Sequence, residues 1–353
     1  MFTYFIIVKP LGLLYGSAGR FLSPENLVGR SGTSFPPSAA TLSGVFAAHY
    51  KGDRSILDEL CLAGPFWAWD EQKRNFYVPT PFNCLVKDGK IKHLLYWHED
   101  KKKWLLPDGG NTPHEKFESG TWIAIKDWTN LNSKPEVTKP PWEFLPHLHP
   151  QLKEDERRVD FTEDAEAKSL FLENSVQLHP EACLVYLSNL ALPSGCYRFG
   201  GEGHIVDIHS QKIKGPAKSL LTENIDRSFA TITPAIWGSN RLSYRAPIKG
   251  KDDSYQFVWF KGRTSQDILP ILTERPLPLR HRLGNSKNQG KNDPKMLSRG
   301  RYAVPPGTVY IADEALNKPW HAWEEKLFPK EGYCYKRWGF GLSLPLVMSG
   351  QKA

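Results

Sequence analysis

The sequence is poor in cysteine, and its cysteines form no pattern that would hold a metal or a disulfide framework. Five cysteines occur in 353 residues, no two of them form a Cys-x-x-Cys pair, and their number is odd. A zinc ribbon or a disulfide-stapled secreted fold is therefore disfavoured. We expect buried thiols in a reducing cytoplasm at all five positions: Cys61, Cys84, Cys183, Cys196 and Cys334.

Long apolar runs are also lacking. No stretch approaches the roughly 20 apolar residues that span a bilayer, and the opening "MFTYFIIVKPLGLLYG" has no basic leader, which favours a first strand over a signal peptide. With 40% hydrophobic and 24% charged residues, the chain is typical of soluble globular proteins, without membrane contact. Its length allows two domains, each with a core of its own.

The common catalytic motifs are missing as well. There is no P-loop, no GxGxxG fingerprint and no GxSxG elbow. A metal site would need Glu202 and His204 on the same face of a strand as Asp207 and His209, whereas alternation places the two pairs on opposite faces. No metal or cofactor is therefore expected. Eleven histidines leave a metal-free ribonuclease open, because such an enzyme needs only a general base and cations.

Acidic residues are scarce where basic ones gather. The net charge is +8, yet residues 227–301 alone hold fifteen Lys or Arg against five Asp or Glu. Within residues 280–301 there are seven basic residues and one acidic residue, with almost no apolar side chains, so a mobile basic loop is expected. The first 51 residues contain a single acid, Glu25. This distribution favours a polyanionic partner.

Periodicity predicts the elements of the first part of the chain. Residues 2–8 are aromatic and β-branched, as a buried strand requires. Apolar and aromatic side chains then recur with helical spacing at Leu42, Val45, Phe46, His49 and Tyr50. Residues 60–142 show short alternating pieces that suggest hairpins and irregular connections.

The second part of the chain is predicted in the same way. Strands are expected over 181–190, 203–210 and 302–312, with a last strand after the Gly-marked turn at 338–344. Residues 264–276 are predicted to hold a short helix. The Pro-rich stretch 128–146 places the domain boundary, giving domains 1–145 and 146–353, the second carrying the basic loop 280–301. Repeated strand–helix–strand units suggest an α+β fold of ferredoxin-like type.

Three glycine-containing stretches, 15–21, 199–204 and 338–344, lie beside cationic residues. Glycine permits close approach of a backbone, and exposed amides can then hold phosphates. The Ser/Gly/Pro-rich segment before the helix at 42–50 would similarly place free amides at a positive helix end. Trp237, Tyr244 and Trp338 are candidates for stacking on unpaired bases.

Four stretches in order resemble one known family. They are "KPLGLLYGSAGRF" (9–21), "FPPSAATLSGVF" (35–46), "RRVDFTEDAEAKSLFLENSVQL" (157–178), and the pair "FGGEGH" (199–204) and "YAVPPGTVYIA" (302–312) followed by "GFG". The chain is similar here to the RAMP superfamily of CRISPR-associated proteins, and within it to the Cmr-type (type III-B) subunit that caps the 5′ handle of crRNA. It departs from the family pattern after Gly200, Gly201 and Glu202, where Gly203 and His204 stand in place of two arginines.

The resemblance implies two ferredoxin-like (RRM-like) domains with inserted β-hairpins and long loops. It implies a non-catalytic cytoplasmic subunit of a type III interference complex that binds the repeat-derived 5′ handle of crRNA. Its partners would be crRNA, the large polymerase-like subunit and the backbone RAMP subunits, with target RNA contacted indirectly. No catalytic residue is expected, because a separate endonuclease processes crRNA in this family.

The candidate RNA-binding residues combine the glycine turns, the helix start and the basic third of the chain. They are Arg20, Arg30, Ser34, Ser38, Thr41, Gly200, Gly201, His204, Arg241, Arg245, Arg299, Arg301, Arg337, Trp338 and Gly339. Two other functions stay open: a RAMP endoribonuclease that processes CRISPR repeat RNA, with His204 or His49 as base, and an aromatic-rich binder of sugars or neutral ligands. The basic excess argues against the last.

Overall fold

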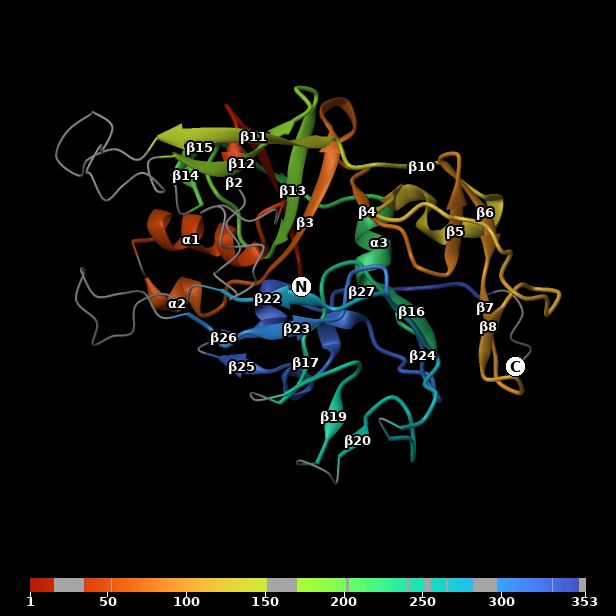
Figure 1. The fold of residues 1–353 in the computed structure, drawn as a ribbon. Helices are drawn as coiled ribbons and strands as arrows, with labels where there is room; N and C mark the ends of the chain where they lie inside the picture. Colours follow the sequence, from red (N-terminus) through yellow and green to blue (C-terminus); the bar gives the residue numbers. More distant parts are fainter. Residues whose placement is uncertain are drawn as a thin grey trace.

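A computed structural model describes residues 1–15, 35–51, 53–150, 170–200, 203–239, 242–250, 255–264, 266–281, 297–331 and 333–348. The fold is mixed α/β with few helices and mostly antiparallel sheets (Figure 1). Among the described residues, no helix has the length and apolar character to cross a membrane.

The largest sheet has eight strands in the order β10-β9-β4-β3-β13-β1-β15-β14. Their bounds are β1 Tyr4–Pro10, β3 Leu62–Trp69, β4 Tyr77–Pro79, β9 Trp122–Ala124, β10 Val137–Thr138, β13 Ala182–Ser188, β14 Gly195–Phe199 and β15 His204–Lys212. All of these strands pair antiparallel. The strands predicted at 2–8, 181–190 and 203–210 are confirmed. The first two are nearly continuous apolar runs, whereas β15 buries only Val206 and Ile208 among polar residues.

Strand β1 contributes side chains to an apolar core on each face of this sheet. Phe5 and Ile7 belong to one apolar cluster, whereas Ile6 and Val8 belong to the other, as the two-residue period of a strand dictates. Helix α1 (Ala39–His49) covers the second face and buries Leu42 and other apolar side chains against it. The predicted helix is therefore confirmed.

The other face of the sheet carries the C-terminal part of the chain. Helix α3 (Pro216–Thr222) leads into a four-stranded sheet with the order β21-β24-β16-β27. Its strands are β16 Ser228–Thr231, β21 Ile271–Leu272, β24 Val309–Ile311 and β27 Ser343–Pro345. Phe229 of β16 stacks on Tyr310 of β24 within the core that also holds Phe5. One continuous apolar core thus joins the two sheets.

Short hairpins and helical turns make up the other elements of the described residues. The two-strand pairs are β5 Cys84–Lys87 with β6 Lys90–Leu94, β7 Tyr96–His98 with β8 Lys103–Leu105, β17 Trp237–Gly238 with β18 Ser243–Tyr244, β19 Ile248–Lys249 with β20 Gln256–Phe257, β22 Leu277–Leu279 with β23 Arg301–Ala303, and β25 Lys330–Glu331 with β26 Tyr333–Cys334. The remaining helical pieces are α2 Arg54–Leu57 and the 3-10 turns η2 Asp70–Gln72, η3 Ile125–Ser133, η6 Trp320–Ala322, η7 Glu325–Leu327 and η8 Tyr335–Trp338.

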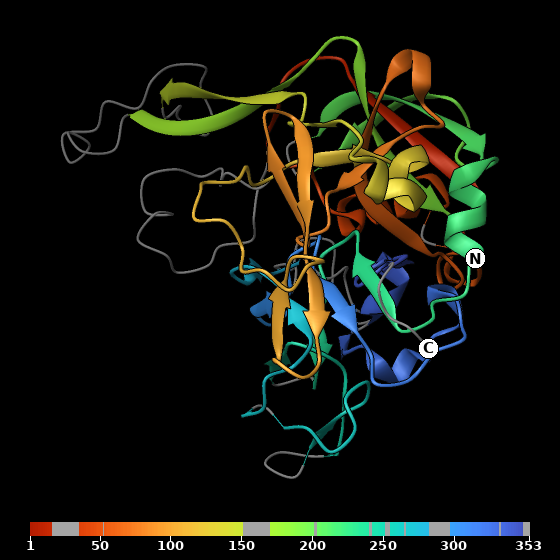
Figure 2. The ribbon, with the colours of Figure 1, turned by 90° about the vertical axis from the view of Figure 1, so that its right-hand side faces the viewer.

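A three-stranded sheet in the order β11-β12-β2 extends from the main body (Figure 2). It contains β2 (Leu14–Tyr15), β11 (Trp142–Pro150) and β12 (Leu170–Leu178). The boundary predicted between residues 145 and 146 falls inside β11, and β13, β14 and β15 beyond it complete the sheet that β1 begins. Strand pairing therefore crosses this boundary, which the local proline content of 128–146 did not indicate.

The short helix predicted over 264–276 is wrong. In its place Leu269 is buried, and β21 pairs with β24. Pro270 cannot donate a helical hydrogen bond, and pairing with an existing strand satisfies the backbone that follows it. The basic segment predicted as a mobile loop lies mostly outside the described residues.

Candidate nucleic-acid interface

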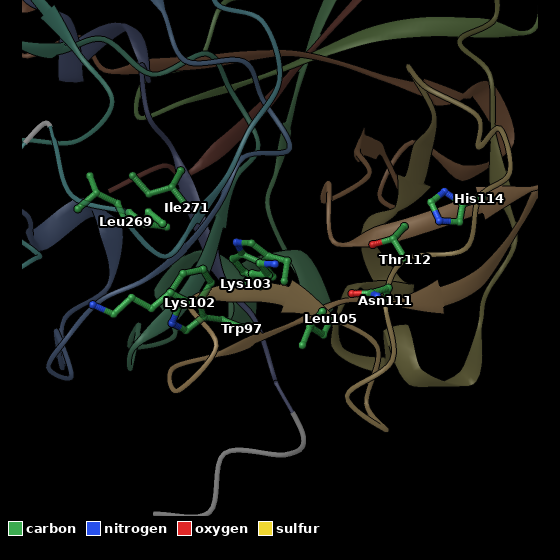
Figure 3. Close-up of a pocket in the computed structure, with 11 residues that line it drawn as sticks. Trp97, Lys102, Lys103, Leu105, Asn111, Thr112, His114, Leu269 and Ile271 are labelled. Carbon is green, nitrogen blue, oxygen red and sulfur yellow. The ribbon is translucent and has the colours of Figure 1, made fainter.

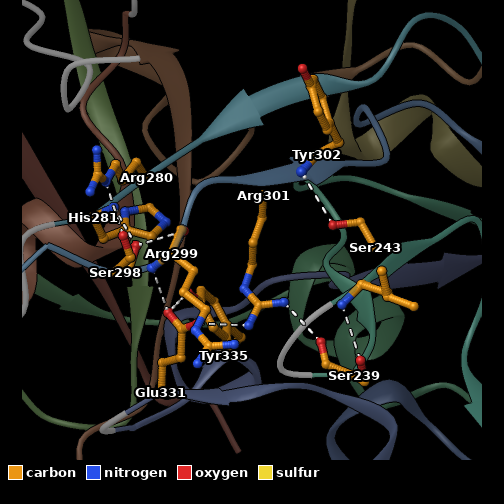
Figure 4. Close-up of polar contacts among 11 residues, drawn as sticks. Ser239, Ser243, Arg280, His281, Ser298, Arg299, Arg301, Tyr302, Glu331 and Tyr335 are labelled. Atoms are coloured by element: carbon orange, nitrogen blue, oxygen red, sulfur yellow. Dashed lines mark hydrogen bonds and ion pairs between the residues drawn. The ribbon is translucent and has the colours of Figure 1, made fainter. Parts of the chain in front are cut away.

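Arg301 forms a polar network below the small sheet β22–β23 (Figure 4). Its guanidinium donates to the carbonyl oxygen of Ser239 at 2.9 Å and to Oε1 of Glu331 at 2.8 Å. The side chains of Arg301 and Glu331 are only 3% and 12% exposed. The Tyr335 hydroxyl donates to Glu331, and the guanidinium carbon lies 5.4 Å from the centre of the Tyr335 ring. This arginine, predicted to contact RNA, is held inside the protein instead.

His281 and Ser298 bring together the two ends of the basic segment. The amide of His281 donates to Oγ of Ser298 at 2.8 Å, and the amide of Ser298 donates to the carbonyl oxygen of His281 at 2.7 Å. Arg280 donates from Nε to the carbonyl oxygen of Ser298. The His281 ring is buried against Trp338 and Phe340. Burial lowers the pKa of His281 to about 4, against the weaker opposing effect of Glu331.

We expect this histidine to destabilise the protein in acid. The lowered folded-state pKa means that the unfolded chain binds the proton more tightly, so stability is complete above about pH 6.5 and falls as the pH drops toward 4. The shift corresponds to about 3 kcal/mol at full protonation. Urea unfolding at pH 7 and pH 4 measures the loss of unfolding free energy between the two conditions. This loss should be smaller in a His281→Leu variant than in the wild type. An equal loss in both proteins would contradict the assignment.

Tyr302 lies on the opposite side of β23 from Arg301. Strand β23 alternates buried, exposed and buried residues, and Tyr302 is 59% exposed. Figure 4 shows the two side chains pointing in opposite directions. The Tyr302 amide donates to Oγ of Ser243, and Pro278 of β22 stands directly across from it. The backbone under this aromatic ring is thus fixed on both sides.

Exposed arginines occur in the segments around this ring. Arg299 precedes β23, Arg275 precedes β22 and Arg245 follows β18, and all three are exposed. Exposed Leu242 and Leu277 add apolar surface on the neighbouring strands or turns. Tyr302 is not among the residues predicted from the sequence, although the alternation of its strand is a signal that could identify it.

Gly339 lies directly against the main sheet. It ends η8 with a φ of +69°, and an added Cβ would lie 2.3 Å from Cβ of Ala63 and 2.7 Å from the carbonyl oxygen of Leu62. Arg337 donates to the carbonyl oxygen of Leu57, and Trp338 packs among His281 and nearby tyrosines. The turn predicted to cradle phosphate therefore joins the C-terminal part of the chain to β3.

The other described candidates lie on different elements. Ser38 precedes α1 without a side-chain cap, and the preceding Pro37 carbonyl accepts a hydrogen bond from the Tyr186 hydroxyl at 2.6 Å. Thr41 lies in the first turn of α1. Gly200 has a φ of +77° in the turn between β14 and β15, and His204 begins β15.

These positions do not form one cradle. The turn before β15 lies at the end of β1, because Pro10 pairs with Val206. Gly339 lies at the start of β1, because Leu62 pairs with Ser188, which pairs with Tyr4. Seven strand residues separate the two turns by about 20 Å. Arg20, Arg30, Ser34, Gly201 and Arg241 lie outside the described residues.

Within the described ranges, no three His, Cys, Asp or Glu residues lie close enough together to hold a metal ion. All five cysteines are free thiols. Cys84, Cys183 and Cys334 are buried as predicted, whereas Cys61 is half-buried and Cys196 is exposed. Cys196 alternates outward on the edge strand β14, which explains the difference.

No known family model matches the sequence, and no curated relative was found. Comparison with solved structures gives a chain of the type III-B Cmr-beta complex bound to cognate target RNA, with 11% identity and a TM-score of 0.49 over 88% of this chain and 86% of that one. A chain of the Csm3–Csm4 subcomplex of the type III-A CRISPR-Cas interference complex gives 11% identity and a TM-score of 0.37 over 89% and 94%. This chain is similar to chains of type III CRISPR complexes.

Proposed function

We propose that this protein is a non-catalytic, RNA-binding subunit of a type III CRISPR interference complex. It binds and caps the 5′ handle of crRNA and joins it to the large polymerase-like subunit and the backbone subunits. The ordered sequence motifs of the RAMP family support this proposal, since they extend from residue 9 to residue 341. The solved complexes named above are assemblies of the same class.

The arrangement of the main sheet supports a ferredoxin-like first half. Strand β1 is followed by α1, then β3, β13 and β15, and these four strands lie in the order β3-β13-β1-β15 with antiparallel pairing. A ferredoxin-like unit has this order. Strand β14 occupies the place in the sequence where that fold has its second helix. The long segment between β3 and β13 carries the inserted hairpins.

The observation that carries RNA binding is the exposed face of β22–β23. An aromatic ring on a fixed strand can stack on an unpaired base of any sequence. Exposed arginines can neutralise the adjoining phosphates. Tyr302 supplies the ring, and Arg245 and Arg299 supply cations within a segment of strong basic excess. Splayed bases of a single-stranded handle fit such a surface.

Replacing Tyr302 by alanine should weaken binding of a single-stranded handle RNA. Loss of one stacked base costs about 1–3 kcal/mol, which is roughly a 5- to 150-fold rise in Kd. Tyr302→Phe keeps the ring and should bind almost as the wild type. Filter binding with crRNA measures both, at several salt concentrations. Tight binding of all three proteins would exclude Tyr302 from the interface.

Two further measurements test the function itself. Wild-type protein with crRNA should protect the 5′ handle from a nuclease and leave the RNA uncut. RNA with a scrambled handle should lose this protection. Specific cleavage of repeat RNA that a His204→Ala substitution abolishes would instead identify the endoribonuclease.

A further inference from the structure

A pocket of about 470 Å³ opens between the β7–β8 hairpin and the segment that leads into β21 (Figure 3). The pocket is shallow and open to solvent, and its volume lies in the range of small-molecule sites. Trp97 and Trp104 come from the two strands of the hairpin, and Leu269 and Ile271 come from the facing segment. Two parts of the chain more than 150 residues apart therefore form one concave surface.

The floor of the pocket is aromatic and fixed in place. Trp97 pairs directly with Trp104 across the hairpin, and their rings lie 5.9 Å apart at an angle of 60°. The indole N–H of Trp97 donates to Oε2 of Glu99 at 2.5 Å, and Glu99 in turn accepts from Arg263 at 2.8 Å. The indole is thus held in a single orientation without a ligand.

The rim of the pocket is cationic and polar. Lys102 and Lys103 stand at the hairpin turn, and Asn111 and His114 follow from the loop after β8. None of the residues that line the pocket is acidic. Within the described part of the chain, neither lysine forms an ion pair.

Two acids, Glu99 and Asp267, interact with Lys102 but already accept hydrogen bonds. Glu99 binds Trp97 and Arg263, and its pKa is lowered chiefly by the hydrogen bond from Trp97. Asp267 accepts from the amide and the hydroxyl of Thr264. Lys102 also lowers the pKa of both carboxyls, but more weakly than these hydrogen bonds do, and it forms no contact ion pair with either. Both lysines can therefore still attract an anion that enters the pocket.

We propose that this pocket binds a single nucleotide, with the base against the indole floor and the phosphate at Lys102 and Lys103. A planar base suits the half-buried ring of Trp104, against which the buried Trp97 packs. The ammonium groups suit a phosphate as point charges. Asn111 offers both a donor and an acceptor to a base edge. The nucleotide is either free or one residue of an RNA strand. The inference does not require handle binding, because the pocket and the Tyr302 face lie on different elements.

Isothermal titration calorimetry with 5′-AMP and with a single-stranded oligoribonucleotide tests the site on the full chain. The double variant Lys102→Ala/Lys103→Ala should bind at least about tenfold more weakly. Lys116→Ala is the matched control, since this exposed lysine lies in the same insertion but does not line the pocket. It should bind as the wild type. Adenosine, which lacks the phosphate, should bind more weakly than 5′-AMP.

The two sources of the nucleotide give different results. Saturation by 5′-AMP assigns the pocket to a free nucleotide, whereas lysine-dependent binding of the oligonucleotide alone assigns it to an RNA strand. An equal loss of affinity in the double variant and in Lys116→Ala would overturn the proposal. So would an unchanged affinity in both variants. Equal binding of a poly-glutamate peptide would identify an unspecific cationic surface. The Tyr302→Ala variant should bind ligands in the pocket as the wild type does. A failure of the pocket proposal can therefore be told apart from a failure of handle binding.

Discussion

The Gly339→Ala variant is expected to unfold at a much lower urea concentration than the wild type. The residue has a φ of +69°, where an L side chain costs roughly 1–2 kcal/mol. The new Cβ would also lie 2.3 Å from Cβ and 2.5 Å from Cα of Ala63, which is fully buried in β3. Ala63 cannot move without disturbing the pairing of β3 with β13, and the Gly339 carbonyl accepts a hydrogen bond from the buried Thr233 hydroxyl. Together with an overpacking cost of about 1–3 kcal/mol, the loss should reach about 2–5 kcal/mol.

Gly262 provides a matched control for the free-energy cost of placing an L side chain at a positive φ. Its φ is +68°, and no atom lies within 4 Å of an added Cβ. Gly262→Ala should therefore lose only about 1–2 kcal/mol. The difference between the two variants measures the close approach of η8 to β3. If both alanines destabilised the protein equally, that close approach would be absent.

The elements that could be predicted from the sequence are those with local patterns. Strand β1 and strand β13 are continuous apolar runs, and α1 shows a 3.6-residue period. Strand β3 was missed, because Gly64 and Pro65 interrupt its apolar residues and suggest a turn. Its pairing partner, β13, lies more than 100 residues away in the sequence. Only tertiary contacts select it.

The candidate site was harder to predict for the same reason. An arginine in a basic stretch is normally exposed, and nothing local indicates that Arg301 is buried. Its burial depends on Glu331 and on the carbonyl of Ser239, which come from distant segments. Gly339 was expected to approach a phosphate closely. It does make a close approach, but to the backbone of β3. The residue type indicated the geometry and not the partner.

Removing the carboxylate of Glu331 should destabilise the protein by about 3–5 kcal/mol, since it leaves the buried Arg301 guanidinium without its counter-charge. Glu331 also accepts from the amide of Arg299 and from the hydroxyl of Tyr335, so these donors lose their acceptor too. Urea unfolding of Glu331→Ala measures the loss.

The exposed pair Lys261–Glu314 is the matched control, because its side chains are 71% and 69% exposed. Glu314→Ala should cost no more than about 1 kcal/mol. The double variant Glu331→Leu/Arg301→Met should regain much of the stability that Glu331→Ala loses, because apolar side chains of similar volume remove both charges. The same variant should keep RNA affinity within a few fold, since Tyr302 and the exposed arginines remain. A large loss of RNA affinity in this stable double variant would return Arg301 to the RNA-binding surface.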